Sequence, residues 1–331
     1  MTVAVKSWPR LEQVAEDVRR VIDESQDIGC LAHKDADADS LGSALAFAAS
    51  VRATGKRVHV MAPDPVPQLL AHLPGYDTLE RMPERLDALF TFDCATLARF
   101  GDKRLLVERT PCVVNVDHHV SNEGFGTINL IEPDASATGQ VLFRLLTALD
   151  LPIPAEAATN LYAALFTDTG GFRHENTTEA ALRLGADLVA RGANPAWVAL
   201  KSYKSRTVPQ LKLEGAALQR MHVDENGTLV WSEITRDMLR DAGADMQESE
   251  GVIDHLQSVD TMKIAVLFKE NENGIIKISV RTRDEFDATD LCIPFGGGGH
   301  RRAAGAELAM TMLEAREKVL ALALRLLRQA R

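Results

Sequence analysis

Short apolar runs alternate with helical patterns from about residue 10 to residue 190. Four of these runs have the length of buried strands, and they lie at 28–32, 57–62, 88–92 and 112–116. Apolar positions recur with helical spacing at 40–54, 138–149 and 155–166. This alternation predicts an α/β domain with a largely parallel sheet.

The pattern changes in the last third of the chain. Residues 180–219 are mainly helical, and 228–234, 262–268 and 275–282 then have the pattern of strands. A polar loop ending at Gly274 joins the last two as a hairpin, and an amphipathic helix is predicted at 312–328. We therefore expect two α/β lobes: a domain at 1–193 with the parallel sheet, a helical linker at 194–219, and a smaller domain at 220–331 with a mixed sheet.

The composition of the 331 residues is that of an ordinary globular protein, with 46% hydrophobic residues. The sequence has no run of about 18 apolar residues that would indicate a membrane span. The polar N-terminus lacks the apolar centre of a signal peptide. The four cysteines lie far apart and form no CxxC pair, which favours reduced thiols. These features predict a cytoplasmic protein with no membrane association.

The formal net charge of −10 weighs against a broad basic surface that coats long nucleic acid. With only 3 Trp and 3 Tyr, strong stacking on long single strands is not expected either. A small phosphorylated substrate needs only a few well-placed arginines, so the charge leaves that class open.

A first candidate site lies directly after the strand at 28–32, where one histidine and three carboxylates open a helix: His33, Asp35, Asp37 and Asp39. In open α/β sheets, ligands bind at this carboxyl end of the strands. Such groups repel one another unless a cation lies between them. Taken alone, the cluster fits equally well a solvated acidic turn in which Asp39 or Ser40 caps the helix.

Further polar residues follow other buried segments in the same manner. Asp93 ends one strand, Asp117-His118-His119 follow another, and Asp168 lies just past an apolar helix. Each alone is more often a surface or capping group, but together they predict a metal site. Imidazole and carboxylate ligands suit Mn²⁺ better than Ca²⁺, and their number indicates two ions.

The order HxxxDxD, D, DHH and D resembles the DHH phosphoesterase superfamily. The segment Gly296–Gly305, with the sequence GGGGHRRAAG, resembles the signature of the DHH-associated C-terminal domain. Together they are similar to the subfamily of nanoRNases (oligoribonucleases) and pAp phosphatases. The resemblance extends from about residue 15 to about residue 325.

The resemblance implies roles for the residues of the first lobe. One metal is bound by His33, Asp37 and Asp93, and the other by Asp39, Asp93, His118 and Asp168. Asp93 then bridges two Mn²⁺ ions, with Mg²⁺ or Co²⁺ as alternatives, and Asp93, His118 and His119 are the catalytic residues. Asp117 orients His118 from outside the ligand set, and His119 faces the substrate phosphate.

The second lobe is expected to bind the substrate. Its glycine run permits close backbone approach, so that successive N–H groups can hold an anion, although a flexible turn is the simpler alternative. By similarity, the residues that bind the phosphate or nucleotide away from the cut are Arg281, Gly297, Gly298, Gly299 and His300. Arg173, Arg301 and Arg302 are weaker candidates.

The expected activity is hydrolysis of short RNA or DNA oligonucleotides and linear dinucleotides to mononucleotides, of pAp to AMP, or of both. Alternatives are a RecJ-like single-strand exonuclease, a cyclic dinucleotide phosphodiesterase, and a non-catalytic regulator. The ligand positions are all filled, which disfavours the regulator. No protein partner is indicated, and a homodimer stays an alternative.

Overall fold

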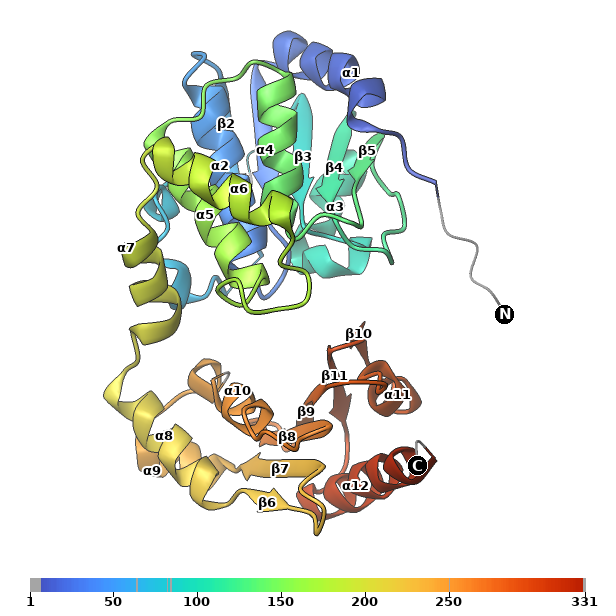
Figure 1. The fold of residues 1–331 in the computed structure, drawn as a ribbon. Coiled ribbons are helices and arrows are strands. Elements are labelled where there is room, and N and C mark those ends of the chain that lie inside the picture. Colours follow the sequence, from blue (N-terminus) through green and yellow to red (C-terminus); the bar gives the residue numbers. More distant parts are fainter. Residues whose placement is uncertain (1–6, 64, 82, 84, 250, 330–331) are drawn as a thin grey trace. The chain divides into compact units, whose positions relative to one another are not determined.

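The computed structural model describes residues 7–329 except 64, 82, 84 and 250, without the side chains of residues 203, 204 and 300. The chain forms two compact units, Met1–Ser205 and Arg206–Arg331, and each contains its own sheet (Figure 1). The boundary between the units falls inside the predicted linker at 194–219.

The sheet of the first unit has five strands, all parallel, in the order β2-β1-β3-β4-β5. The strands are β1 (Asp27–Leu31), β2 (Arg57–Met61), β3 (Ala88–Phe92), β4 (Val113–Asp117) and β5 (Ile128–Ile131). The predicted parallel α/β class is therefore confirmed. The strand β5 was not predicted, because it is short and only its last two residues are buried.

Helices pack around this sheet, the last two of them mainly against another helix (Figure 1). They are α1 (Leu11–Glu24), α2 (Ala38–Arg52), α3 (Arg104–Arg109), α4 (Thr138–Ala148), α5 (Ala155–Asp168), α6 (Glu179–Ala190) and α7 (Pro195–Ala199). Almost every residue of α2 is buried, because the helix packs against the sheet and against α5. Gly42 permits this close packing, since a Cβ atom there would lie 2.9 Å from the carbonyl oxygen of Asn160 in α5.

The strand order predicts a ligand site at the carboxyl ends of the strands. The chain passes from β1 to β2 on one side, whereas β3 lies on the other side of β1. In a doubly wound sheet, the crevice at such a reversal is the usual binding site. The loops after β1, β3 and β4 carry His33, Asp93 and His118, so the topology brings these residues to one edge.

The sheet of the second unit has six strands in the order β10-β11-β9-β8-β7-β6. They are β6 (His222–Val223), β7 (Leu229–Ile234), β8 (Ile264–Glu270), β9 (Ile276–Thr282), β10 (Gly298–His300) and β11 (Ala303–Leu308). The pair β7–β8 is parallel and the other pairs are antiparallel, so the predicted mixed sheet is confirmed.

Both faces of this mixed sheet are covered. The helices are α8 (Val208–Gln219), α9 (Arg236–Ala242), α10 (Val252–Gln257), α11 (Thr289–Cys292) and α12 (Met312–Gln329). In β8, Val266 and Phe268 belong to the core beneath α12, whereas Ala265 and Leu267 belong to the core beneath α8 and α10. Within the described part of the chain, no helix is long and apolar enough to cross a membrane.

Candidate metal centre

The first group of candidate metal ligands is formed by His33, Asp37 and Asp93, whose ligand atoms all lie within 4.8 Å of one another. Nε2 of His33 is 3.4 Å from Oδ2 of Asp93 and 3.8 Å from Oδ2 of Asp37. Nδ1 of His33 lies 2.8 Å from the carbonyl oxygen of Lys34, which can only accept a hydrogen bond. This contact puts the ring proton on Nδ1 and leaves the Nε2 lone pair for a metal.

The cap of α2 is Asp37, and not Asp39 or Ser40 as considered from the sequence. Oδ1 of Asp37 accepts a hydrogen bond of 2.9 Å from the backbone N–H of Ser40. Its other oxygen, Oδ2, faces His33. The hydroxyl of Ser40 accepts a hydrogen bond from the N–H of His33 and donates one to the carbonyl of Phe92, which holds the ends of β1 and β3 together.

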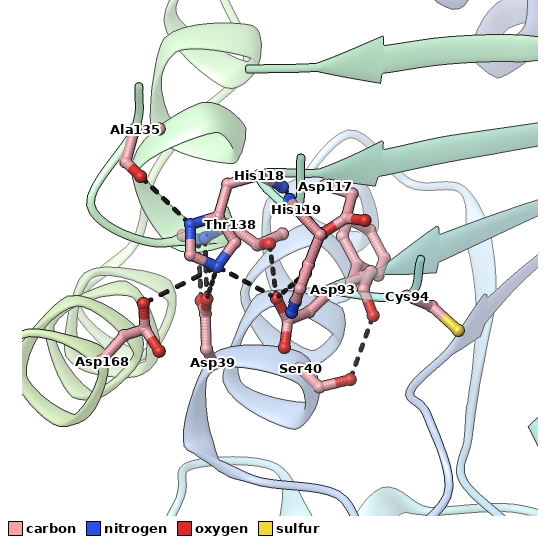
Figure 2. Close-up of polar contacts among 12 residues, drawn as sticks. Asp39, Ser40, Asp93, Cys94, Asp117, His118, His119, Ala135, Thr138 and Asp168 are labelled. Carbon is pink, nitrogen blue, oxygen red and sulfur yellow. Dashed lines mark hydrogen bonds and ion pairs between the residues drawn. The ribbon is translucent and has the colours of Figure 1, made fainter. Parts of the chain in front are cut away.

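The second group is formed by Asp39, His118 and Asp168 (Figure 2). Nε2 of His118 is 3.6 Å from Oδ2 of Asp168, the last residue of α5, and 3.9 Å from Oδ2 of Asp39. Asp39 accepts hydrogen bonds of 2.7 and 2.9 Å from the backbone N–H groups of Thr138 and Gly139. The N-terminus of α4 therefore stabilises a buried carboxylate.

Asp93 belongs to the first group and forms a further group with His118 and His119, so it links the two sets of ligands. Its Oδ2 faces His33, and its Oδ1 lies 3.5 Å from Nε2 of His118. The hydroxyl of Thr138 donates a hydrogen bond of 2.9 Å to Oδ1. The backbone of Asp93 is left-handed, with φ 61°, a conformation that costs free energy in a residue other than glycine. The fold thus holds this carboxylate where each of its oxygens faces a different histidine.

The three residues Asp117-His118-His119 differ from the expected arrangement in one respect. The fully buried Oδ1 of Asp117 accepts hydrogen bonds from the backbone N–H of His118 and from the ring Nδ1 of His119, both at 2.7 Å. The ring Nδ1 of His118 instead lies 3.0 Å from the carbonyl oxygen of Ala135. Asp117 therefore orients the ring of His119, and a backbone carbonyl orients the ring of His118.

Burial makes this site electrostatically costly without a cation. Burial and the neighbouring carboxylates raise the pKa of Asp39 well above its usual value, and burial is also the main cause that raises the pKa of Asp168 to about 7. Burial opposes ionisation of Asp93 as well, but the nearby histidines hold its pKa below the ordinary range. A divalent cation would relieve this repulsion, and the imidazole and carboxylate donors fit a transition metal ion.

Several residues of the site were not predicted. Thr138 and Gly139 hold Asp39, Asn122 donates a hydrogen bond to Asp117, and Asn176 donates to the carbonyl of Asp168. The need for glycine at position 139 comes from packing in the folded protein, because a Cβ atom there would lie 2.7 Å from Ala164 in α5. The sequence around Gly139 does not show this contact.

The glycine run lies in the second unit, and its members have different structural roles. A Cβ atom on Gly297 would overlap the carbonyl oxygen of Gly305, and one on Gly299 would lie 2.5 Å from the carbonyl oxygen of Ala303. A Cβ atom on Gly298 would meet no heavy atom of the described residues within 4 Å. Packing against β11 therefore explains two of these glycines but not Gly298.

The basic residues near this run also differ. Arg281 is half-buried on β9, opposite Ala303 of β11, and its guanidinium contacts the carbonyl of Val280 at 3.1 Å. The guanidinium of Arg302 donates to the carbonyl of Asp284 at 2.7 Å, which gives it a structural role. The backbone of His300 belongs to β10, but its side chain lies outside the described part of the structure.

The fold and the site define a metal-binding α/β protein whose candidate ligands follow β1, β3, β4 and α5. Residues 27–165 match the N-terminal domain of the DHH family, and residues 226–329 match the DHHA1 domain. The bifunctional oligoribonuclease and PAP phosphatase NrnA of Thermus thermophilus is 31% identical over 95% of this chain and 93% of that protein. The chain belongs to the DHH family and is a metal-dependent phosphoesterase.

Two solved structures share the fold. An exopolyphosphatase-related protein from Bacteroides fragilis has a TM-score of 0.89, with 25% identity and 98% of each chain covered. RecJ of Thermus thermophilus, in complex with Mn²⁺, has a TM-score of 0.58 and 17% identity, over 97% of this chain and 56% of that one. The likeness to RecJ is one of fold alone.

Proposed function

We propose that this protein is a two-metal-ion phosphoesterase that hydrolyses short oligonucleotides to mononucleotides and pAp to AMP. The observation that carries the proposal is the position of Asp93, one buried carboxylate whose two oxygens face the histidines of two separate ligand groups. The similarity over nearly the whole chain to a protein named oligoribonuclease and PAP phosphatase supports the choice of substrate.

We assign the ions to the two ligand groups. His33, Asp37 and Asp93 hold one, and Asp39, His118 and Asp168 hold the other together with Asp93. Mn²⁺ is the proposed ion, because it suits mixed nitrogen and oxygen donors and because RecJ, which shares the fold, was solved with it. When bound, the two ions supply an activated water and neutralise charge on the phosphoryl group.

His119 acts on the substrate rather than on the metal in this proposal. Its Nδ1 is held by Asp117 at 2.7 Å, and we assign to the ring a hydrogen bond donated to a phosphate oxygen. Burial disfavours the charged imidazole, but the carboxylates around it, Asp117 first, raise its pKa to about 9. A protonated His119 stabilises the negative charge that gathers on the phosphoryl oxygens.

We assign the second unit to the part of the substrate remote from the cut, through Arg281, His300 and the glycine run. The support comes from Gly298, where a Cβ atom would contact none of the described residues, so that packing among them does not explain the glycine. A backbone without a side chain permits close approach of a phosphate to its N–H group. The same assignment treats 1–193 as the catalytic domain and 220–331 as the substrate domain.

The test is hydrolysis of 5′-labelled RNA, from dinucleotides to oligomers of about 24 nucleotides, with Mn²⁺, beside pAp and a cyclic dinucleotide. Rapid cleavage of the shortest oligomers with weak action on long strands supports the proposal, and the pAp rate measures the phosphatase activity. Faster degradation of long strands would favour a RecJ-like exonuclease. Preference for the cyclic substrate would favour a cyclic dinucleotide phosphodiesterase, and no turnover at all would favour a regulator.

A further inference from the structure

Arg99 is a cation beside the candidate metal ligands to which the proposed mechanism gives no role. It lies in the 3₁₀ segment Leu97–Lys103 that follows β3 and Asp93, and its side chain is exposed. Its Nη2 atom is 3.0 Å from both ring nitrogens of His33. Because the two distances are equal, Nη2 lies over the ring and not in line with the lone pair of Nε2.

The backbone fixes Arg99 at this place. Its carbonyl oxygen accepts a short hydrogen bond of 2.6 Å from the N–H of Lys34, the residue after His33, and its N–H donates to the carbonyl of Thr96 at 3.2 Å. The chain then turns at Gly101, which is left-handed with φ 51°. The loop after β3 is thus tied to the loop after β1, and the guanidinium extends from this junction.

No ion pair joins Arg99 to a carboxylate within the described part of the chain, although the site beside it is rich in carboxylates. The exposed side chain of Lys34 is equally without an ion pair there. The nearby Arg104, by contrast, is paired with Glu108 at 2.8 Å. The Nε and Nη1 donors of Arg99, which have no partner among the described residues, are therefore available for an anion from solution.

A metal ion bound by the group that contains His33 would repel a guanidinium held this close, unless an anion lies between the ion and the guanidinium. An anion with several oxygens satisfies both, because a guanidinium donates two parallel hydrogen bonds to phosphate oxygens. We propose that Arg99 binds a non-bridging oxygen of the phosphoryl group that is cleaved, on the side of the site formed by His33. This inference rests on the proposed function for the identity of the reacting group.

The test compares Arg99→Ala and Arg99→Lys with the wild-type protein and with Arg104→Ala, an exposed neighbouring arginine on α3. Calorimetry measures Mn²⁺ binding first and then the binding of inorganic phosphate to the Mn²⁺-loaded protein. We expect unchanged Mn²⁺ affinity in all variants. Phosphate affinity should fall by about tenfold or more in Arg99→Ala, recover partly in Arg99→Lys, and stay at the wild-type value in Arg104→Ala.

Kinetics on a dinucleotide give a second readout. Arg99→Ala should lower kcat by about tenfold to a hundredfold with a smaller change in KM, since the contact strengthens as charge develops on the phosphoryl oxygens. Unchanged phosphate affinity and unchanged kcat would overturn the inference. Loss of Mn²⁺ binding in both Arg99 variants would also overturn it, because it would show a structural role. If the wild-type protein cleaves no nucleotide, the proposed function fails, while the phosphate titration still decides the role of Arg99.

Discussion

The carboxylate of Asp117 accepts a hydrogen bond of 2.7 Å from the ring Nδ1 of His119, two residues further along the chain. The same oxygen accepts the backbone N–H of His118, so one buried carboxylate fixes both the path of the chain and the orientation of one ring. The ring of His118 depends on the carbonyl of Ala135 instead. The two adjacent histidines are therefore oriented independently.

This independence predicts a selective effect of Asp117→Asn. The amide can still accept from Nδ1 but no longer carries the charge that favours a protonated His119. We expect kcat to fall by about tenfold to a hundredfold while Mn²⁺ affinity, measured by calorimetry, changes much less. Asp134→Asn, an exposed carboxylate of the same unit, is the control and should behave as wild type. A large loss of Mn²⁺ affinity in Asp117→Asn would contradict the separation of roles.

Asp93 should be the most sensitive position in the protein, because it is the ligand that we propose the two ions share. We expect Asp93→Asn to bind neither ion tightly and to reduce turnover to below about one thousandth of the wild-type rate. His33→Ala should lose one of the two ions, because His33 belongs to a single group. The measurement is the number of Mn²⁺ ions retained after gel filtration. Two ions retained by Asp93→Asn would exclude Asp93 as the shared ligand.

The sequence was sufficient to predict the fold class and the residues that meet at the sheet edge. The reason is geometric: the carboxyl ends of parallel strands lie at one edge, so polar residues after β1, β3 and β4 had to meet. It was not sufficient to predict the partners of Asp39. These partners are backbone N–H groups of α4, and every residue except proline has such a group, so the residue type does not reveal them. They also lie 99 and 100 residues further along the chain. The strands β5, β6 and β10 were missed because they are short, and β11 was missed because it consists mainly of alanine and glycine, which do not have the pattern of a strand.

The buried ionisable groups predict how the stability of the metal-free protein depends on pH. The pKa of Asp168 is raised to about 7 and that of His119 to about 9, so both groups bind protons more tightly in the folded than in the unfolded chain. Their stabilising contributions are present at low pH and are lost as pH rises through these values. The lowered pKa of Asp93 acts in the opposite direction only at more acidic pH.

We therefore expect the Tm in EDTA to decrease by about 5 °C or more between pH 5.5 and pH 9, as the protons on these groups are lost. In Mn²⁺ the slope should weaken or reverse, because ion binding requires deprotonated ligands and stabilises the folded state by mass action. Asp168→Asn serves as the matched variant, and its Tm in EDTA should fall less steeply near pH 7. Parallel curves with and without Mn²⁺ would show that these groups do not form the metal site.

Two neighbouring glycines allow the proposed role of the second unit to be tested against a structural one. Gly297→Ala places a methyl group against the carbonyl of Gly305 and should lower the Tm by several degrees. Gly298→Ala meets no atom of the described residues within 4 Å and should leave the Tm near that of wild type. If a substrate phosphate approaches the backbone at Gly298, the KM for short oligonucleotides should nevertheless rise by about tenfold in this variant. Melting curves and steady-state kinetics on both variants separate the two effects, and a wild-type KM in Gly298→Ala would remove Gly298 from the substrate site.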